Sequence, residues 1–189
     1  MDNSIKLDDS QVGGNFIGRD DKSINIINHN TFASSIYLQN LYECYQKEKL
    51  DNPEFKKLCE ELDSFNSIVK GDVMGLEEKL RQGGRERLIA YALDVKEKFH
   101  KKLIKTSQFS NIAQDINVYL LSKVHKGFMM DIYHLICEGE SDDKINLLIN
   151  ERIIKPVQQD LGINPLKYNE NDIMGMIFFL TGNCHIKWN

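Results

Sequence analysis

Proline is scarce in this sequence and accounts for only 3 of its 189 residues. Because proline lacks a backbone N–H and blocks a helix interior, so few of them permit many long helices. The 41% hydrophobic and 28% charged residues indicate a folded chain with amphipathic segments rather than a disordered one. A chain of this size buries roughly 70% of its unfolded surface, so we expect it to fold without disulfide or metal staples.

Cysteine pairs at redox or metal-binding spacing are also missing. Cys44, Cys59, Cys137 and Cys184 are scattered along the chain, and cysteine within an apolar helical pattern acts as a small hydrophobe. We therefore expect a reducing, cytoplasmic environment. The start of the chain has no basic segment followed by an apolar run, and the most apolar stretch, 173–180, is too short to cross a bilayer. We expect no membrane insertion.

Short motifs of nucleotide, zinc and serine chemistry are absent as well. There is no GxxxxGKS or GxxxxGKT loop, no HExxH and no GxSxG elbow. The five histidines do not pair with each other at ligand spacing. His134 and Cys137 could bring a base and a nucleophile onto neighbouring helical turns, but no third orienting group is evident. We predict no catalytic residue, no cofactor and no metal.

An acidic cluster keeps an enzymatic alternative open. Glu138, Glu140, Asp142 and Asp143 could serve a divergent metal-dependent nuclease or nucleotide hydrolase. The same carboxylates stand at an expected helix start, where the helix dipole and solvation already favour negative charge. We therefore prefer the interpretation without an enzyme.

Residues 1–33 differ from the rest in being rich in glycine, asparagine and aspartate. Glycine supplies turn conformations, and residues 23–26 alternate polar and apolar side chains as a half-buried strand does. We expect a short β-hairpin-like or flexible segment. A lone hairpin is marginal in water, so this one needs a pairing surface, in a homo-oligomer or on another protein. The candidate partner-binding residues of the segment are Phe16, Ile17, Arg19, Ile24 and Ile26.

Residues 34–189 follow helical periodicity and predict a mainly α, multi-helix bundle-like interaction domain. The first expected helix is capped by Ser34 or Ser35, and the second begins at Pro53. A short helix over 76–80 follows, and a long one over 85–105 buries a stripe of apolar residues.

Three further helices are expected in the second half of this domain. Ser107 is the expected cap of a long helix that is kinked at Gly127. Ser141 caps the next helix, which Pro156 must bend or end. The run 128–130, Phe-Met-Met, is either core or a soft partner-binding face, because methionine adapts to irregular surfaces, and we favour the core.

The final helix is apolar on more than one face, so we expect it in the centre of the domain. Asn169 or Asn171 caps it. Gly175 permits close helix approach, and Gly182 is expected to end the helix in a left-handed turn. Trp188 follows in extended chain and is a further candidate partner-binding residue. It either packs on the body, the alternative that we favour, or anchors a partner.

A basic run contrasts with the net charge of −4. Lys98, Lys101, Lys102 and Lys105 fall near one another on successive turns of the helix expected over 85–105. Such a face could contact phosphates, and a solvated helix face explains it equally well. The acidic balance argues against a protein whose whole surface grips nucleic acid, so these lysines are candidates for local nucleic-acid contact.

Four stretches of the sequence resemble a known family. They are GGNFIGRD at 13–20, NPEFKKLCEEL at 52–62, GLEEKLRQGGRERLIAYALDVKEKFHKKL at 75–103 and DIMGMIFFLTGNCHIKWN at 172–189. Together they resemble the helical C-terminal domain of ABC-three-component (ABC-3C, Lamassu-like) anti-phage conflict systems. The part of the chain that resembles this domain is 36–189. The first stretch resembles short glycine-rich segments that precede effector-associated modules.

The resemblance implies a non-catalytic interaction or accessory subunit of a bacterial defence complex. The partners that it implies are an ABC or SMC-like ATPase and a nuclease or other effector, with nucleic acid reached indirectly through the complex. In that family the domain commonly follows an effector domain, whereas residues 1–33 precede it here, so docking or regulation is expected rather than killing. A DNA-binding helical adaptor that uses the Lys98–Lys105 face remains an alternative, as does the enzyme described above.

Overall fold

The computed structural model describes residues 35–48, 59–68 and 74–189. All regular secondary structure in these ranges is helical, and no strand occurs in them. The predicted mainly α class is therefore confirmed. Outside the described residues lies the predicted hairpin-like segment at 1–33, with its candidate residues Phe16, Ile17, Arg19, Ile24 and Ile26.

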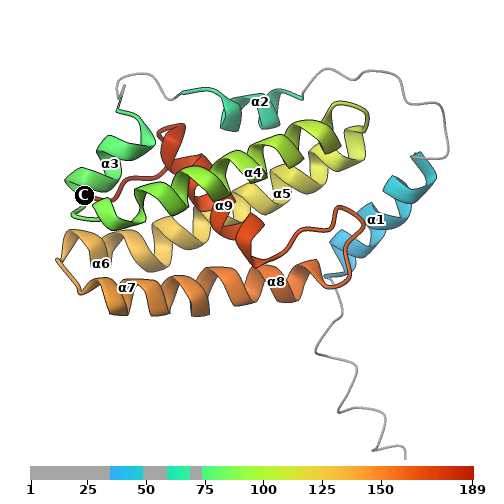
Figure 1. Ribbon diagram of the computed structural model, residues 1–189. Coiled ribbons are helices and arrows are strands. Elements are labelled where there is room, and N and C mark those ends of the chain that lie inside the picture. The colour runs from blue at the N-terminus through green and yellow to red at the C-terminus, as the bar shows by residue number, and fades with distance from the viewer. Residues whose placement is uncertain (1–34, 49–58, 69–73) are drawn as a thin grey trace, which may run out of the picture. The chain divides into compact units, whose positions relative to one another are not determined.

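The first half of the described chain contains α1 to α4 (Figure 1). Their bounds are α1 Ile36–Glu48, α2 Glu60–Asn66, α3 Leu76–Gln82, the 3₁₀ turn η2 Glu86–Leu88 and α4 Ile89–Ser107. Ser35 caps α1 as predicted, since its Oγ accepts a hydrogen bond from Leu38 N at 3.4 Å. The stripe predicted to face inward along α4 is buried at Ala92, Val95, Phe99 and Leu103.

The second half holds two long helical rods and α9. Their bounds are α5 Asn111–Gly127, η3 Phe128–Ile132, α6 Tyr133–Cys137, α7 Asp142–Ile149, η4 Asn150–Ile154, α8 Lys155–Leu161 and α9 Glu170–Gly182. Both η3 and η4 are π-helical turns. Because they are helical themselves, α5 continues into α6 and α7 continues into α8 (Figure 1).

These two π-helical turns stand where the sequence predicts a kink, at Gly127, and a bend or an end of the helix, at Pro156. η3 begins directly after Gly127, the predicted kink site. η4 precedes α8, whose first turn contains Pro156. A proline in a regular helix clashes with the carbonyl four residues earlier, and a wider turn relieves that clash. Of the two outcomes predicted for Pro156, the end of the helix does not occur.

Ser110, and not Ser107, caps α5. Ser110 has extended backbone angles, and its Oγ accepts a hydrogen bond from Ala113 N at 2.9 Å. Ser107 is the last residue of α4, and its buried Oγ accepts a hydrogen bond from Asn117 Nδ2 at 3.0 Å. The prediction for Ser107 is wrong because its hydroxyl is used inside the core instead of at a helix start.

The caps predicted for α7 and α9 are confirmed. Ser141 Oγ accepts a hydrogen bond from Lys144 N at 3.4 Å. At α9, Asn169 rather than Asn171 is the cap: its Oδ1 accepts from Asp172 N at 3.3 Å, and Asp172 Oδ2 accepts from Asn169 N at 2.9 Å. These reciprocal bonds form a capping box, which satisfies two amides at the start of α9.

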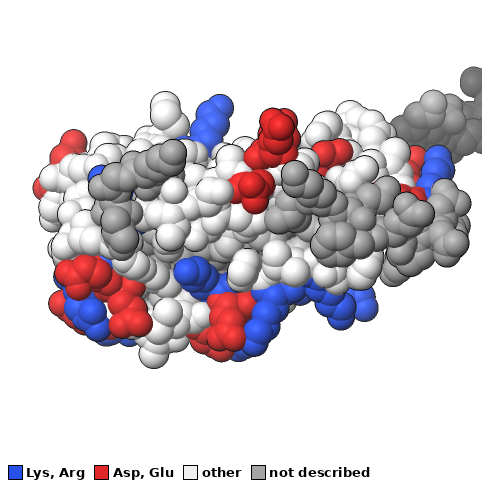
Figure 2. All heavy atoms as spheres, turned by 90° about the horizontal axis from the view of Figure 1, so that it is seen from above, with Lys and Arg blue, Asp and Glu red and all other residues white. Residues whose placement is uncertain are grey.

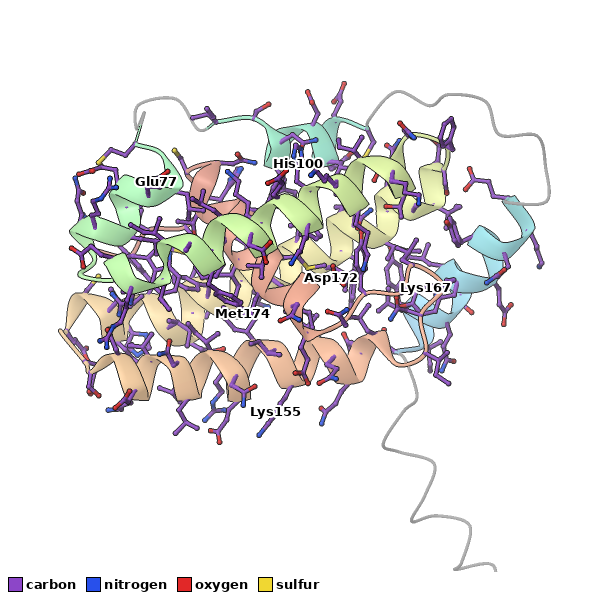
Figure 3. All side chains as sticks on the ribbon, in the orientation of Figure 1. Glu77, His100, Lys155, Lys167, Asp172 and Met174 are labelled. Atoms are coloured by element: carbon purple, nitrogen blue, oxygen red, sulfur yellow. The ribbon has the colours of Figure 1, made fainter. Side chains whose placement is uncertain are left out.

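The final helix, α9, lies in the centre of the domain, as the sequence predicts. It is buried along most of its length and contacts α3, α4, α5 and α8. Figure 1 shows α9 crossing α4, and Figure 3 shows side chains filling the space between α4, α9 and the two rods. A Cβ added to Gly175 would lie 2.6 Å from Val95 O and from Phe99 Cβ. The predicted role of Gly175 in close helix approach is therefore confirmed.

Gly182 ends α9, but not in a left-handed turn. The residue with positive φ is Cys184, at 67°. It lies beside His185, whose amide donates back to Leu180 O at 2.9 Å. The prediction of left-handed backbone at Gly182 is wrong because the left-handed residue comes two positions later.

Candidate functional site

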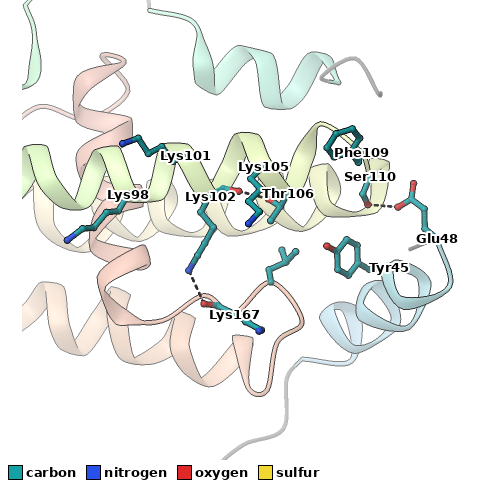
Figure 4. A pocket seen from close by; sticks show the side chains of 11 residues that line it. Tyr45, Glu48, Lys98, Lys101, Lys102, Lys105, Thr106, Phe109, Ser110 and Lys167 are labelled. Carbon is teal, nitrogen blue, oxygen red and sulfur yellow. Dashed lines mark hydrogen bonds between the residues drawn. The ribbon is translucent and has the colours of Figure 1, made fainter. Parts of the chain in front are cut away.

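The four lysines of the predicted basic face line a hollow of about 770 Å³ (Figure 4). Its walls come from the second half of α4, the end of α1, the turn between α4 and α5, and the loop that precedes α9. The lining residues are Tyr45, Glu48, Lys98, Lys101, Lys102, Lys105, Thr106, Phe109, Ser110, Leu166 and Lys167. The structure therefore brings the predicted face together and adds to it a fifth lysine and two aromatic rings.

The lysines of α4 gather on one wall because of their helical spacing. Positions 98, 101, 102 and 105 are three or four residues apart, so their side chains leave the same side of the helix. The other side of α4 carries Phe99 and Leu103, both fully buried. Burial of that apolar stripe fixes the rotation of α4 and so turns the lysine face outward.

Two of these lysines form ion pairs along α4 itself. Lys98 Nζ lies 2.6 Å from Asp94 Oδ2, and Lys101 Nζ lies 2.6 Å from Glu97 Oε1. The hydrogen bond from Lys101, followed by its charge, lowers the pKa of Glu97. All four side chains are more than half exposed, and such pairs contribute little to stability. Figure 2 likewise shows acidic and basic side chains side by side on the face that it displays, rather than one continuous basic surface.

Lys102 is instead part of the internal structure. Its Nζ lies 2.7 Å from Asp172 Oδ2, donates to Lys167 O at 2.9 Å, and lies 5.2 Å from the centre of the Tyr168 ring. The Asp172 side chain is only 8% exposed and also belongs to the capping box of α9. Lys102 therefore fastens the loop before α9 to α4, and its charge is already used.

The loop before α9 holds Lys167 in an unusual conformation. Lys167 has a φ of 56°, in the left-handed region that residues with a Cβ seldom adopt. The Asn164 side chain accepts from Tyr168 N at 2.7 Å and donates to Tyr168 O at 3.0 Å, and Lys167 N donates to Asn164 O at 3.1 Å. Tyr168 OH donates to Asn117 Oδ1 at 2.7 Å in the core. These bonds determine the backbone position of Lys167.

The opposite wall contains one carboxylate, which is already engaged. Glu48, at the end of α1, accepts a hydrogen bond from Ser110 Oγ and lies 3.1 Å from Asn111 N and 3.4 Å from Ile112 N. It therefore occupies the positive end of the α5 dipole. Beside it, burial and then the charge of Glu48 raise the pKa of Tyr45.

Lys105 and Lys167 are the remaining cations of the hollow. Neither forms an ion pair with a residue in the described ranges, and Figure 4 shows the Lys105 side chain extending from α4 toward the loop that carries Lys167. The aromatic rings of Tyr45 and Phe109 and the aliphatic Leu166 line the same space. The chemical character of the hollow is that of a site for an anion that also has an apolar or aromatic part.

Sequence reasoning missed Lys167, Tyr45 and Phe109 as parts of this hollow. They come from three segments that are distant from the basic run and from each other, so helical spacing carries no signal for them. Only the folded arrangement of α1, α4 and the loop before α9 brings them together (Figure 4).

Trp188 packs on the body, which is the alternative that the sequence favours. The residue is 1% exposed, and its Nε1 donates to Thr181 Oγ1 at 3.0 Å. Its ring centre lies 5.1 Å from that of Phe128 and 6.1 Å from that of Phe178. The Arg85 guanidinium carbon lies 5.1 Å from the same ring centre. In this conformation the indole presents almost no surface to a partner.

The run 128–130 divides between core and surface. Phe128 is buried, whereas Met129 and Met130 are 37% and 68% exposed. The predicted core placement is therefore wrong for the two methionines, since η3 packs only one of its faces against the body. His134 and Cys137 are both exposed. A hydrogen bond between the side chains of Cys137 and Tyr133 raises the pKa of the tyrosine.

The acidic cluster behind the enzymatic alternative takes part in ion pairs. Asp142 lies 3.0 Å from Arg85 and 3.3 Å from Arg87, and Glu140 pairs with Lys144. Within 35–48, 59–68 and 74–189, no group of three or more His, Cys, Asp or Glu residues is arranged to hold a metal ion. In the same ranges no helix combines the length and apolar character that a membrane span requires.

Residues 75–188 match the model of a known protein family. This stretch, more than half of the 189 residues, matches the family described as C-terminal domain 9 of the ABC-three component (ABC-3C) systems. It includes α3 to α9 and all the lysines of the hollow. No curated protein and no solved structure matches the chain.

Proposed function

We propose that this chain, which belongs to the family of C-terminal domain 9 of the ABC-three component systems, is a non-catalytic interaction subunit of a bacterial anti-phage defence complex. The family match carries the proposal, because a domain of a multi-component system has other protein subunits beside it. The matched residues contain the whole packed pair of α4 and α9. The family assignment thus rests on the core of the domain.

The proposed partners are an ABC or SMC-like ATPase and a nuclease or other effector, in the cytoplasm. A relation to Lamassu-type systems, and a role for the glycine-rich residues 1–33 in assembly or homo-oligomerisation, are parts of the same proposal. Nucleic acid would then be reached mainly through the complex.

Exposed apolar side chains on η3 and α7 support a docking role. Met129 and Met130 on η3 and Leu147 on α7 are 37%, 68% and 55% exposed. The two elements pack against each other, and methionine side chains adapt to irregular partner surfaces. Covering exposed apolar groups of this kind with a protein partner removes them from water and lowers the free energy of the complex.

Co-purification tests the proposal. The tagged chain is co-expressed with an ABC or SMC-like ATPase and an effector from the same genome, and we expect them to elute together. Met130→Asp should weaken this association without changing the melting temperature, whereas Ile163→Asp, at a residue that is 87% exposed elsewhere, is the matched control. If the wild-type chain eluted alone in the presence of both gene products, the result would contradict the proposal.

The enzymatic alternative has its own test. We expect no hydrolysis when the purified chain is incubated with nucleotides or nucleic acid and Mg²⁺ or Mn²⁺. Asp142, the most highly paired carboxylate of the acidic cluster, supplies the variant. Metal-dependent cleavage that disappears in Asp142→Asn would show that the chain is an enzyme.

A further inference from the structure

We propose that the hollow between α1, α4 and the loop before α9 binds a nucleoside phosphate, either free or as one unit of a single-stranded nucleic acid. In this arrangement Lys105 and Lys167 contact the phosphate, and Tyr45 and Phe109 contact the base. The inference goes beyond the proposed function, because it assigns a ligand to this chain itself and does not depend on which proteins it joins.

The distribution of free charge places the phosphate. Lys102 is held by Asp172 and by Lys167 O, so its ammonium is committed to the fold. Lys105 and Lys167 have no ion-pair partner among the described residues and line the hollow from two different walls (Figure 4). A phosphate between them would receive charge-assisted hydrogen bonds from both sides.

Lys98 and Lys101 can add to this attraction. Their pairs with Asp94 and Glu97 are exposed and lie within one helix. Exposed pairs of this kind are weak, so their ammonium groups can turn toward a bound anion at little cost. Lysines at the rim also raise the local concentration of anions, even on a protein with a net charge of −4.

The carboxylate of Glu48 excludes the phosphate from the end of the hollow at the start of α5. Glu48 accepts from Ser110 Oγ and Asn111 N at the start of α5, so the amides there are not available to a second anion. Its negative charge also repels a phosphate from that end of the hollow. The phosphate is therefore placed on the side of Lys105 and Lys167, and the uncharged part of the ligand lies toward α1.

The aromatic walls suit that uncharged part. Tyr45 and Phe109 line the hollow near Glu48. Phe109 is 44% exposed, although contact between an apolar ring and water is unfavourable. A nucleobase stacks on such rings whatever its sequence identity, which is how single-stranded nucleic acids and nucleotides are commonly held. A volume of about 770 Å³ also lies within the range of small-molecule sites.

Binding of defined probes to residues 1–189 tests the inference. The probes are AMP, ADP and ATP, a fluorescent oligo-dT, and the two single-feature controls adenosine and inorganic phosphate. We expect nucleotides to bind more tightly than either control, because only they have both the charge and the ring. Oligo-dT binding in addition to mononucleotide binding would identify nucleic acid as a source of the ligand, and mononucleotide binding alone would identify free nucleotides.

Variants decide whether the binding occurs in this hollow. Lys105→Gln and Lys167→Gln should each weaken nucleotide binding about tenfold, the usual effect of losing a charged hydrogen bond. Phe109→Ala should weaken nucleotide binding but leave the affinity for inorganic phosphate unchanged. Lys155→Gln, at an exposed lysine on α8 outside the hollow, is the matched control and should change neither. Circular dichroism checks that every variant is folded.

Three results would overturn the inference. The first is the absence of binding of any nucleotide or oligonucleotide at millimolar concentration. The second is binding that the double variant Lys105→Gln/Lys167→Gln leaves unchanged, which would place the site elsewhere. The third is equal affinity for phosphate and nucleotide, which would leave a simple anion site without a role for the aromatic rings.

Discussion

The two ends of α4 use their cations in opposite ways. Just before its first turn, Arg85 is buried, lies 3.0 Å from Asp142 and contacts the Trp188 ring. Toward its last turn, Lys105 and, on the neighbouring loop, Lys167 line an open hollow and have no ion-pair partner among the described residues. The first end is closed by its charged and aromatic groups, and the second end keeps them accessible.

This contrast shows that basic residues near one another on the chain can have different structural roles. A buried cation with several partners is costly to disturb, whereas an exposed ammonium contributes little to the free energy of folding. The useful signal is a cation that the fold does not need. Variants at the two ends test whether they differ in this way.

Loss of the Trp188 ring should have the largest effect. Trp188→Ala removes a buried ring from between Arg85 and Phe178 and should lower the free energy of unfolding by about 3–5 kcal/mol. Urea denaturation measures this loss. Ile163→Ala, at an 87% exposed residue, is the control and should stay within about 0.5 kcal/mol of wild type. An unchanged urea midpoint for Trp188→Ala would mean that this end is not closed.

The crossing of α4 and α9 should be the next most sensitive feature. A methyl group in Gly175→Ala would lie 2.6 Å from Val95 O, a backbone atom that cannot move freely, so we expect a loss of about 1–3 kcal/mol. In Gly182→Ala the methyl group would meet the end of the flexible Lys96 side chain instead. That variant should be close to neutral in thermal melts. Equal losses for both variants would contradict the difference in packing.

Two histidines with lowered pKa values should make the stability depend on pH. Burial, followed by the charge of His125, lowers the pKa of His185, and burial, followed by the charge of Lys96, lowers the pKa of His100. Such a histidine binds a proton more readily in the unfolded chain, so the folded state loses stability as the pH falls below about 6.5. Urea midpoints should therefore be lower at about pH 5.5 than at about pH 7.5.

A histidine variant separates this effect from general acid sensitivity. His185→Gln should reduce the difference between the two urea midpoints, whatever its effect on absolute stability at either pH. The groups around His185 include the Phe65 ring, at 5.4 Å between ring centres, and His125, at 6.2 Å. A midpoint that rises on acidification, in wild type, would show that the sign of this linkage is wrong.

Much of the closed part of the molecule could be predicted from the sequence. The apolar stripe of α4, the central place of α9 and the need for Gly175 all follow from periodicity and side-chain size, which are local properties. Caps were predictable to within a few residues. The error between Ser107 and Ser110 arises because both serines could cap a helix, and only tertiary packing decides which hydroxyl is needed inside.

Only the α4 wall of the hollow could be predicted from the sequence. The lysines of α4 share a face through their spacing, but Tyr45 and Lys167 reach the same space through the tertiary placement of α1 and of a loop. The left-handed backbone at Lys167 also has no sequence signal, because it depends on the hydrogen bonds of Asn164. Gly127 and Pro156 mark the places of η3 and η4 in the sequence, but they do not specify that the irregularity there is a π-helical turn.

The smallest expected effect lies at the open end and tests the contrast most directly. Lys105→Gln and Lys167→Gln should each change the free energy of unfolding by less than about 0.5 kcal/mol, because neither ammonium has an ion-pair partner among the described residues. Lys102→Gln, on the same helix face, loses the bonds to Asp172 and to Lys167 O and should cost about 1 kcal/mol. Urea midpoints of the three variants measure the difference.

The comparison between Lys102→Gln and Lys105→Gln tests whether the two lysines have different roles in the stability of the fold. If Lys105→Gln and Lys102→Gln were equally destabilising, the whole face would be part of the structure, and the two ends of α4 would not differ. A Lys105→Gln chain as stable as the wild type, by contrast, would show that the fold does not require the Lys105 ammonium group.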